Sequence, residues 1–327
     1  MSEQAETVTP RIALVLGLTG GVGGATAKAL ASHGWQIRAM ARDPERARLG
    51  ARASYPVQWL RGDAMNSDEV SRAAEGAELI VHAVNPPQYK NWRGLALPML
   101  ANTIAAARQS GARIVLPGNV YVFGPDAWPV ATESSPLHPL TRKGAVRVEM
   151  ERMLREAAPD VRSLVVRAGD FFGPGSGASS SFNLVVAKGG RNLKKIVDLG
   201  RNDAGHSWAY LPDLAEAIVK LVAIQDRLAD TEVVHFGGHW IEPGRGLAEA
   251  IRRVLHRPRL PLRKFPWVLV YLAAPFMELM RELIEMRYLW DVPLRLDNRK
   301  LVGLIGPEPH TPLDTAITAA LDAATVR

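Results

Sequence analysis

Short apolar runs recur along the first half of the chain, and a longer polar or alanine-rich segment separates each run from the next. Runs of this length are typical of buried strands, and they predict strands at 12–16, 36–41, 57–60, 78–84 and 113–116. The segments between them predict helices, the clearest of them at 92–110. Strands that alternate with helices at this interval require a parallel sheet with right-handed crossovers and helices on both faces. The pattern therefore predicts an α/β fold with a doubly wound parallel sheet.

Three glycines, Gly17, Gly20 and Gly23, separate the first predicted strand from the first predicted helix. In a dinucleotide site the first glycine permits the tight turn, the second lets the backbone approach a pyrophosphate, and the third brings helix against strand. The N-terminus of the helix then faces the phosphates. A flexible surface loop is the alternative, but it predicts neither the strand before the glycines nor the helix after them. We therefore predict that a nucleotide binds at this turn.

The residue that ends the second predicted strand decides which nucleotide is expected. A carboxylate there would bond the ribose 2′-hydroxyl, whereas an arginine accommodates a 2′-phosphate. Arg42 holds this position and Asp43 follows it. The sequence therefore favours NADP over NAD. In the alternative, Arg42 is a solvated surface base and Asp43 binds the ribose.

Ligands of such sheets bind outside the carboxyl ends of the strands, so the loops after the predicted strands share one crevice. We expect one of these loop residues, an aspartate, to contact the adenine. The expected cofactor contacts are Gly17, Thr19, Gly20, Gly21, Val22, Gly23, Arg42, Asp63 (the adenine contact), Ala83, Val84 and Asn85.

The composition excludes several classes of site. The 327 residues include no cysteine, so disulfides, zinc-thiolate sites and cysteine nucleophiles are excluded, and a reducing compartment fits. No spacing of His, Asp and Glu indicates a metal site. The formal net charge is +7, but the basic residues are scattered without a dense run or interleaved aromatics. Nucleic acid is therefore not an expected partner, and an anionic cofactor explains the charge as well.

Two segments bear on where the protein works. The first ten residues contain acids where a secretory signal would contain bases, and we expect a cytoplasmic protein. The longest apolar stretch, 265–276, is well below the ~20 residues of a membrane-spanning helix and contains Pro266 and Pro275. We interpret it as a buried helix, a lid or a subunit contact, and attachment to a membrane surface is the less favoured alternative. The aromatic residues from Phe265 to Trp290 are interpreted as the core of a small lobe plus a dimer face, rather than as a substrate pocket.

Six landmarks occur along the chain in an order that a known family shares. They are Gly17 to Gly23, Gly62-Asp63, Val120 to Gly124, Arg167 to Pro174, Trp208 to Ala215 and Leu296 to Leu301. In this order they resemble the extended short-chain dehydrogenases/reductases, the NAD-dependent epimerase/dehydratase family. The resemblance implies a Rossmann domain over 1–170 and a small substrate-binding lobe over 171–327, from which some segments return to the Rossmann sheet. It also implies a small-molecule substrate. The family often forms homodimers through two long helices, here about 92–110 and 137–158.

The resemblance implies a catalytic set that this chain replaces. The family uses a Tyr-x-x-x-Lys helix and a Ser or Thr at the end of the fifth strand. The tyrosine moves a proton while hydride passes to or from the nicotinamide, and the lysine assists the tyrosine and holds the ribose. When Glu151 is aligned with the glutamate that follows the family's lysine, Lys143 takes the tyrosine position and Arg147 the lysine position. Asn119 takes the place of the serine or threonine.

Three interpretations of this departure remain open. In the first, Lys143 is the acid/base in a dry pocket, with its ammonium destabilised by Arg147, and Asn119 polarises a carbonyl oxygen. In the second, Tyr121 or Tyr89 supplies the proton, although each taken singly is more typical of a packing residue. Both predict an NAD(P)-dependent oxidoreductase or epimerase/dehydratase-like enzyme that transfers hydride at a carbinol or carbonyl carbon. In the third, the fold binds NADP without catalysis, as a sensor or regulatory protein.

Three residues are expected to contact the substrate. The resemblance places Asp170 where an asparagine of the family often touches substrate, and Tyr89 lies in the loop after the fourth strand. Asn183 opens a helical segment after the glycine- and serine-rich linker 173–181, which we interpret as a lid or a simple connector. His206 is interpreted as a structural residue rather than a general base.

Overall fold

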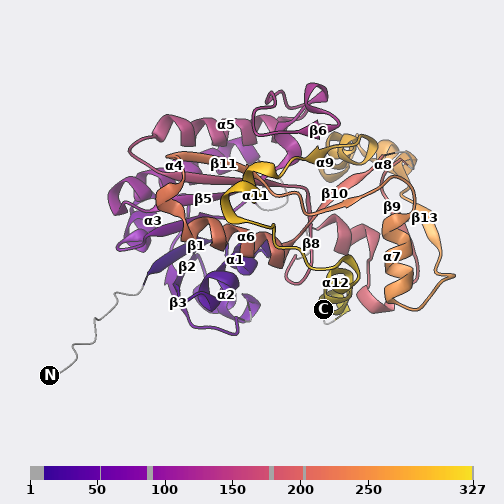
Figure 1. Cartoon of the computed structure of the whole chain (residues 1–327), viewed down its shortest axis with the longest axis horizontal. Helices are drawn as coiled ribbons and strands as arrows, with labels where there is room; N and C mark the ends of the chain where they lie inside the picture. The colour runs from indigo at the N-terminus through magenta and orange to yellow at the C-terminus, as the bar shows by residue number, and fades with distance from the viewer. Residues whose placement is uncertain (1–10, 52, 87–90, 177–179, 202–203, 326–327) are drawn as a thin grey trace.

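A seven-stranded sheet forms the main layer of the computed structural model, which describes residues 11–51, 53–86, 91–176, 180–201 and 204–325 (Figure 1). Its strands, in spatial order, are β11 (Thr231–His235), β7 (Ser163–Ala168), β5 (Arg113–Asn119), β4 (Leu79–His82), β1 (Ile12–Leu16), β2 (Gln36–Ala41) and β3 (Val57–Arg61). Every neighbouring pair is parallel, which confirms the predicted doubly wound sheet. The chain runs outward from β1 to β3 and resumes on the other side of β1 at β4. The topological switch point therefore lies at the carboxyl ends of β1 and β4.

Helices cover both faces of this sheet. On one face α1 (Gly21–Ser32) packs against α6 (Leu211–Ala223). On the other face lie α3 (Ser67–Ala74), α4 (Trp92–Ser110) and α5 (Arg142–Ala157), and α2 (Pro44–Ala51) connects β2 to β3. Successive residues of β1 point to opposite faces: Ala13 joins the core beneath α1, whereas Leu14 joins the core beneath α4. Because both faces are buried, all residues of the strand are apolar. A parallel sheet buried on both faces needs this unbroken apolar pattern.

A second group of small sheets stands beside the main sheet (Figure 1). Its three-stranded sheet contains β8 (Asp170–Phe172), β10 (His206–Tyr210) and β12 (His239–Ile241), and two-stranded pairs join β9 (Ile196–Asp198) to β13 (Leu262–Lys264) and β6 (Val130–Ala131) to β14 (Arg295–Leu296). With α7 (Gly246–Val254) and α12 (Leu313–Thr325), several of these strands enclose a separate apolar core. β11 follows β8 in the sequence yet is a strand of the main sheet, and α6, which also follows β8, packs on a face of that sheet. The division of the chain at residue 170 stays a prediction.

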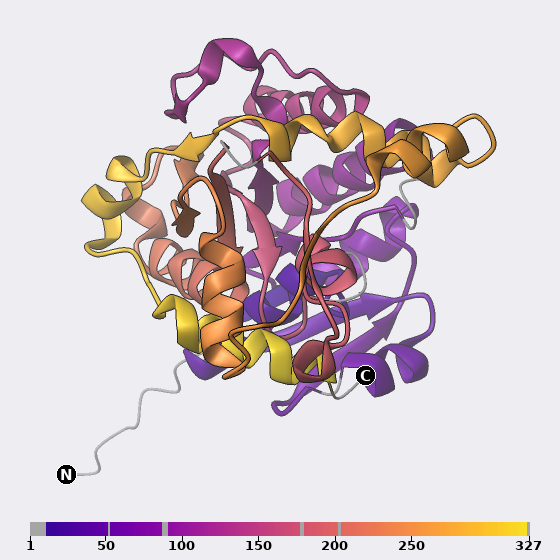
Figure 2. The same ribbon diagram turned by 90° about the vertical axis from the view of Figure 1, so that its right-hand side faces the viewer.

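Four short helices lie in the last part of the chain: α8 (Trp267–Ala273), α9 (Glu278–Met286), α10 (Tyr288–Asp291) and α11 (Arg299–Ile305). Figure 2 shows α8 and α9, in orange and gold, at one edge of the molecule. Phe265, Trp267 and Trp290 pack in the second core, as the core interpretation requires. Tyr271 and Phe276 are 46% and 88% exposed and so lie outside this core, and the dimer face stays a prediction. Within the described ranges, every helix is too short or too polar to cross a membrane.

Local capping and strand pairing explain where the element boundaries differ from the prediction. α5 begins at Arg142 rather than near 137, because the hydroxyl of Thr141 accepts a hydrogen bond from the N–H of Gly144 and caps the helix. β5 extends to Asn119 rather than Leu116, because its backbone stays in register with β7 as far as Ala168. Asn119 therefore lies at the carboxyl edge of the sheet, where ligands of this architecture bind.

Candidate functional site

The turn between β1 and α1 is built from closely packed glycines. Gly17 has φ of +91°, and a Cβ there would lie 2.6 Å from the carbonyl oxygen of Ala83. A Cβ on Gly23 would lie 2.3 Å from the carbonyl oxygen of Gly17, so both positions exclude a side chain. At Gly20, by contrast, the nearest contact of a Cβ would be 3.3 Å. No side chain in the described part of the chain caps α1, and its first turn contains no acidic residue, so the helix N-terminus can receive a diphosphate.

Ala83, Val84 and Asn85 follow β4 and lie beside this turn. The N–H of Ala83 donates to the carbonyl oxygen of Leu16 at 2.9 Å, and the backbone of Ala83 and Val84 packs against Gly17. Asn85 connects this edge to α5, because its Oδ1 accepts a hydrogen bond from Nη2 of Arg147 at 3.0 Å. The structure thus brings the expected cofactor residues of two separate loops together at the switch point.

The ends of β2 and β3 present the residues expected at the adenosine. Arg42 is exposed. Asp43 accepts a hydrogen bond from the N–H of Arg46 at 3.1 Å and so caps the start of α2. Asp63 is half-buried, and one of its carboxylate oxygens accepts from the N–H of Met65 at 3.0 Å. At this edge Arg42 is thus exposed, while Asp43 accepts a backbone hydrogen bond through one of its two carboxylate oxygens.

Lys143 and Arg147 lie on successive turns of α5, and both side chains are buried, at 4% and 8% exposure. Lys143 forms an ion pair with the Glu282 carboxylate of α9, and its Nζ also donates to the carbonyl oxygen of Glu282 at 3.4 Å. Arg147 stacks over the Trp92 ring of α4, with its Cζ 5.1 Å from the ring centroid. We call Asn119, Lys143, Arg147 and Glu282 the cation site.

Asn119 and the start of α5 meet through the short turn that follows β5. Oδ1 of Asn119 accepts a hydrogen bond from the N–H of Tyr121 at 3.1 Å. Gly144 packs so closely on this turn that a Cβ would lie 2.2 Å from the carbonyl oxygen of Tyr121. Because Oδ1 of Asn119 faces this backbone, the amide Nδ2 is the group that remains available as a donor to a ligand. The half-buried Tyr121 packs with Met286 and Leu289, whereas Tyr89 lies outside the described residues.

Sequence reasoning missed α9 as a part of this site. Glu285 accepts hydrogen bonds from the backbone N–H groups of Arg142 at 2.5 Å and Lys143 at 3.3 Å, which are at the start of α5. Nη2 of Arg142 also lies 3.2 Å from a carboxylate oxygen of Glu282. Two carboxylates of one helix therefore compensate the positive N-terminus of another helix and its buried lysine. The only sequence signal is that Glu282 and Glu285 are three residues apart, and so share a helix face.

The other end of α5 is anchored to the main sheet by a buried ion pair. Arg167 of β7 donates to both carboxylate oxygens of Glu151, at 3.0 and 2.6 Å, and both side chains are almost fully buried.

His82, at the end of β4, contacts Thr103 Oγ1 at 2.8 Å. Burial, assisted by the charge of Arg147, lowers the pKa of His82 from 6.5 to about 3. His82 is therefore neutral at physiological pH and adds no further positive charge beside Arg147.

Asp170 lies behind a pocket in the second group of sheets and is held by three donors. Nε2 of His206, Nε1 of Trp290 and Oγ of Ser181 lie 3.2, 3.1 and 3.1 Å from its Oδ2. Burial acts to raise the pKa of Asp170, but these hydrogen bonds and the charge of His206 outweigh burial and hold the pKa below its usual value. His206 also contacts the carbonyl oxygen of Leu289 at 3.1 Å, so it bridges two elements as a structural residue would.

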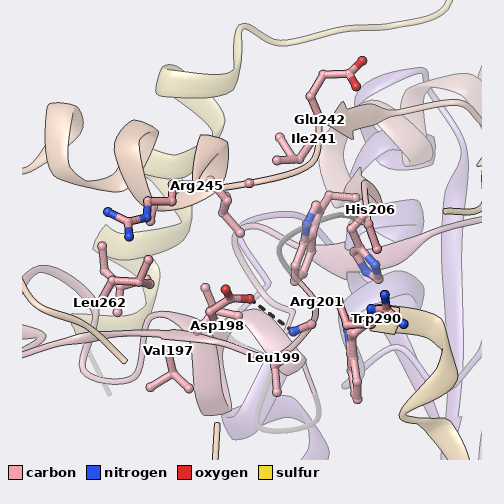
Figure 3. Close-up of a pocket in the computed structure, with 18 residues that line it drawn as sticks. Val197, Asp198, Leu199, Arg201, His206, Ile241, Glu242, Arg245, Leu262 and Trp290 are labelled. Atoms are coloured by element: carbon pink, nitrogen blue, oxygen red, sulfur yellow. Dashed lines mark hydrogen bonds between the residues drawn. The ribbon is translucent and has the colours of Figure 1, made fainter. Parts of the chain in front are cut away.

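The pocket in front of Asp170 has an empty volume of about 620 Å³, part of which is open to solvent. Figure 3 shows the side chains of His206 and Trp290 at one side of it, with Arg245 and Leu262 at the opposite side. Asn183 does not line this pocket; it donates through Nδ2 to Oγ of Ser176 at 2.7 Å, and the backbone of Ser176 packs on Gly21 at the start of α1. In the described part of the chain, no group of three or more His, Asp or Glu residues could hold a metal ion.

A family of nucleotide-dependent enzymes matches this architecture and site. The sequence model of the NAD dependent epimerase/dehydratase family matches residues 13–237, which is most of the chain, and the chain belongs to that family. The resemblance inferred from the six landmarks is thereby confirmed.

The particular relatives show how far the likeness extends. A 3-diazoavenalumate denitrifying reductase from Streptomyces sp. is 30% identical over 182 residues, which span 50% of this chain and only 57% of that relative. UDP-glucuronic acid 4-epimerase from Bacillus cereus, solved with UDP-glucuronic acid and NAD, superposes with a TM-score of 0.77 at 13% identity, over 96% of this chain and 99% of that chain. A dTDP-glucose 4,6-dehydratase from Streptomyces venezuelae, solved as a double mutant with NAD bound, gives 0.76 at 16% identity over 96% of each chain. At these identities the solved structures establish the fold.

Proposed function

We propose that this protein is an NADP-dependent oxidoreductase that acts on a carbinol or carbonyl carbon of a small-molecule substrate. The observation that supports this most directly is the cation site. Two buried cations, Lys143 and Arg147, occupy the helix that bears the catalytic tyrosine and lysine in the family, and they lie against the turn that follows Asn119. Removing two cations from water costs free energy unless carboxylates or a bound anion compensate their charge. Their position beside the glycine turn favours a role in cofactor binding and proton transfer.

The glycine turn and the N-terminus of α1 would hold the diphosphate of the cofactor. Arg42 would hold the 2′-phosphate and Asp63 the adenine, while Ala83, Val84 and Asn85 would line the path to the nicotinamide. When bound, the nicotinamide would supply or accept a hydride. The solved neighbours contain NAD, so the preference for NADP rests on Arg42 and on the capping role of Asp43. We expect Arg42→Ala to weaken NADPH binding about tenfold and leave NADH binding unchanged in a fluorescence titration; equal effects on both would exclude the preference.

In the reductive direction, Lys143 donates a proton to the carbonyl oxygen of the substrate and becomes a neutral amine. The amide of Asn119 donates a hydrogen bond to the same oxygen, because its own oxygen is already engaged by Tyr121. Glu282 holds the ammonium in place before the transfer, and Arg147, fixed by Asn85 and Trp92, holds the ribose side of the site. The proton given up by Lys143 is replaced from solvent.

A second candidate function is a sensor that binds NADP without turnover. The observation that favours it is the ion pair between Lys143 and Glu282, because an ammonium held by a carboxylate and by a backbone carbonyl is a poor proton donor. In this function α9 reports the state of the cofactor site through Glu282, and the cations only bind ribose and phosphate.

Turnover of a substrate panel separates the two functions. We would follow NADPH oxidation against carbonyl compounds and sugar nucleotides. A diazo compound belongs in the panel, because the Streptomyces relative bears the name 3-diazoavenalumate denitrifying reductase. We expect Lys143→Met to lower turnover at least about 100-fold and to leave NADPH affinity within a few-fold. The matched control is Tyr121→Phe, and a larger loss there would make Tyr121 the proton donor. Binding of NADPH without oxidation across the panel would favour the sensor.

A further inference from the structure

The hairpin formed by α8 and α9 (267–286) exposes an apolar face to solvent. Val268, Leu269, Leu272 and Phe276 are 72%, 62%, 67% and 88% exposed. Their spacing of one, three and four residues places them on one side of the α8 helix and its continuation. The opposite side is buried, because Val270 is only 5% exposed. The face presents on the order of several hundred Å² of apolar surface, which is as much as the largest patch on a typical monomer.

The shape of this hairpin favours docking on a lipid surface rather than in the groove of another protein. Figure 2 shows the turn between α8 and α9 at the outer edge of the molecule, pointing away from the main sheet. Phe276 and Met277 lie in this turn and are 88% and 49% exposed. A short convex projection with its largest apolar side chain at the tip can enter a lipid interface, whereas a second copy of the chain would need a broad complementary face.

Basic and amphipathic side chains surround the apolar tip. Arg281 donates through Nη1 to the carbonyl oxygens of Ala274 and Pro275, at 2.9 and 3.3 Å, so its guanidinium lies directly behind the tip. Tyr271 is 46% exposed, and its hydroxyl accepts a hydrogen bond from Arg287 at 3.2 Å, while Arg287 also forms an ion pair with Asp291 at 3.0 Å. Arg263, just before α8, is exposed, and the chain as a whole has a net charge of +7. The exposed Glu278 is the opposing charge on the outer part of the hairpin, since Glu282 and Glu285 face α5.

We propose that the α8–α9 hairpin docks the protein on an anionic lipid surface, with Leu269, Leu272 and Phe276 entering the acyl boundary. Apolar side chains at the tip, an aromatic hydroxyl beside them and cations behind them match the order of acyl, interfacial and headgroup layers. The inner side of the same α9 helix holds Glu282 against Lys143. Docking therefore places the cation site beside the lipid surface.

Flotation of the full-length protein with lipid vesicles tests this proposal without cofactor or substrate. The probes are phosphatidylcholine vesicles and vesicles in which about one-third of the lipid is phosphatidylglycerol. We expect flotation with the anionic vesicles, and at least about a tenfold loss of binding for the double variant Leu272→Ser, Phe276→Ser. The matched control is Leu49→Ser on α2, because Leu49 is 74% exposed in a different part of the molecule. We expect this control to bind like the unchanged protein.

The absence of cysteine from the chain permits a second, more local measurement. Phe276→Cys and Leu49→Cys each provide a single thiol for an environment-sensitive fluorophore. We expect anionic vesicles to shift the emission to the blue at position 276 and not at position 49. No shift at either position, or equal shifts at both, would overturn the proposal. A blue shift that appears without vesicles and rises with protein concentration, together with a doubled mass in light scattering, would also overturn it, because a second copy would then cover the hairpin.

Discussion

The glycine turn and the cation site lie at the same edge of the sheet but are built from segments at very different separations along the chain. In the turn, Gly17, Gly20 and Gly23 come from one short segment, and a Cβ on Gly17 or Gly23 would lie 2.6 or 2.3 Å from a backbone carbonyl oxygen, so neither position admits a side chain. In the cation site, Lys143 is neutralised by Glu282, which lies 139 residues later in the chain. The comparison teaches that the turn depends on contacts within one segment, whereas the cation site depends on contacts between distant segments, so a substitution can disturb one without the other.

The largest effect is expected where the turn is broken. Gly23→Ala places a Cβ 2.3 Å from the carbonyl oxygen of Gly17, so the helix must move away from the strand. We expect NADPH affinity to fall at least about 100-fold, or about 2.7 kcal/mol, in a fluorescence titration. The control is Gly50→Ala on α2, where a Cβ would meet nothing within 4 Å. Affinity within threefold of the original for Gly23→Ala would show that the close packing of α1 on β1 is not what forms the site.

A smaller effect is expected when the cation site loses its long-range partner. Glu282→Gln leaves the buried ammonium of Lys143 without its carboxylate, and we expect the free energy of unfolding to fall by about 2 kcal/mol, less than for a fully buried pair because Glu282 is 13% exposed. The double variant with Lys143→Met should recover most of this loss in urea denaturation. Arg142→Ala, whose side chain is 80% exposed, serves as the control and should change the value little. If the double variant is no more stable than Glu282→Gln, the two residues are not coupled.

The smallest effect concerns His82, which lies where the two regions meet. Its pKa is about 3 in the folded protein, because of burial first and the charge of Arg147 second, against 6.5 in the unfolded chain. As pH falls below 6.5, the unfolded chain therefore binds a proton that the folded protein does not, and the free energy of unfolding decreases until about pH 3. At pH 5.5 the loss from this residue is about 1 kcal/mol.

Denaturation at pH 7.5 and 5.5 measures this contribution. His82→Asn should reduce the decrease between the two pH values by about 1 kcal/mol. His256→Asn is the matched control, because His256 is exposed and its φ of +53° is one that asparagine tolerates. The same decrease in the protein with His82→Asn as in the unchanged protein would show that His82 is not the group that titrates.

Much of the fold could be predicted because its signals are local. β1, β2 and α4 begin where the apolar pattern placed them, and the order of strands around β1 follows from alternating strands and helices. The place of Asn119, Lys143 and Arg147 at one edge could also be predicted from the landmarks. Which aromatic residues between Phe265 and Trp290 are buried could not be predicted, because the sequence of α8 shows an apolar face without showing what covers it. In the structure Tyr271 and Phe276 are exposed, while Trp267 is packed.

The sequence by itself determined the parallel sheet and the glycine turn, because each depends on neighbours within a few residues or on a strand–helix alternation. Only the tertiary structure decided that α9 returns to α5, that Glu282 compensates Lys143 and that the outer face of the hairpin meets solvent. The physical reason is that an ion pair between distant segments, and the exposure of a helix face, depend on how separately formed elements pack, and no local pattern encodes that packing.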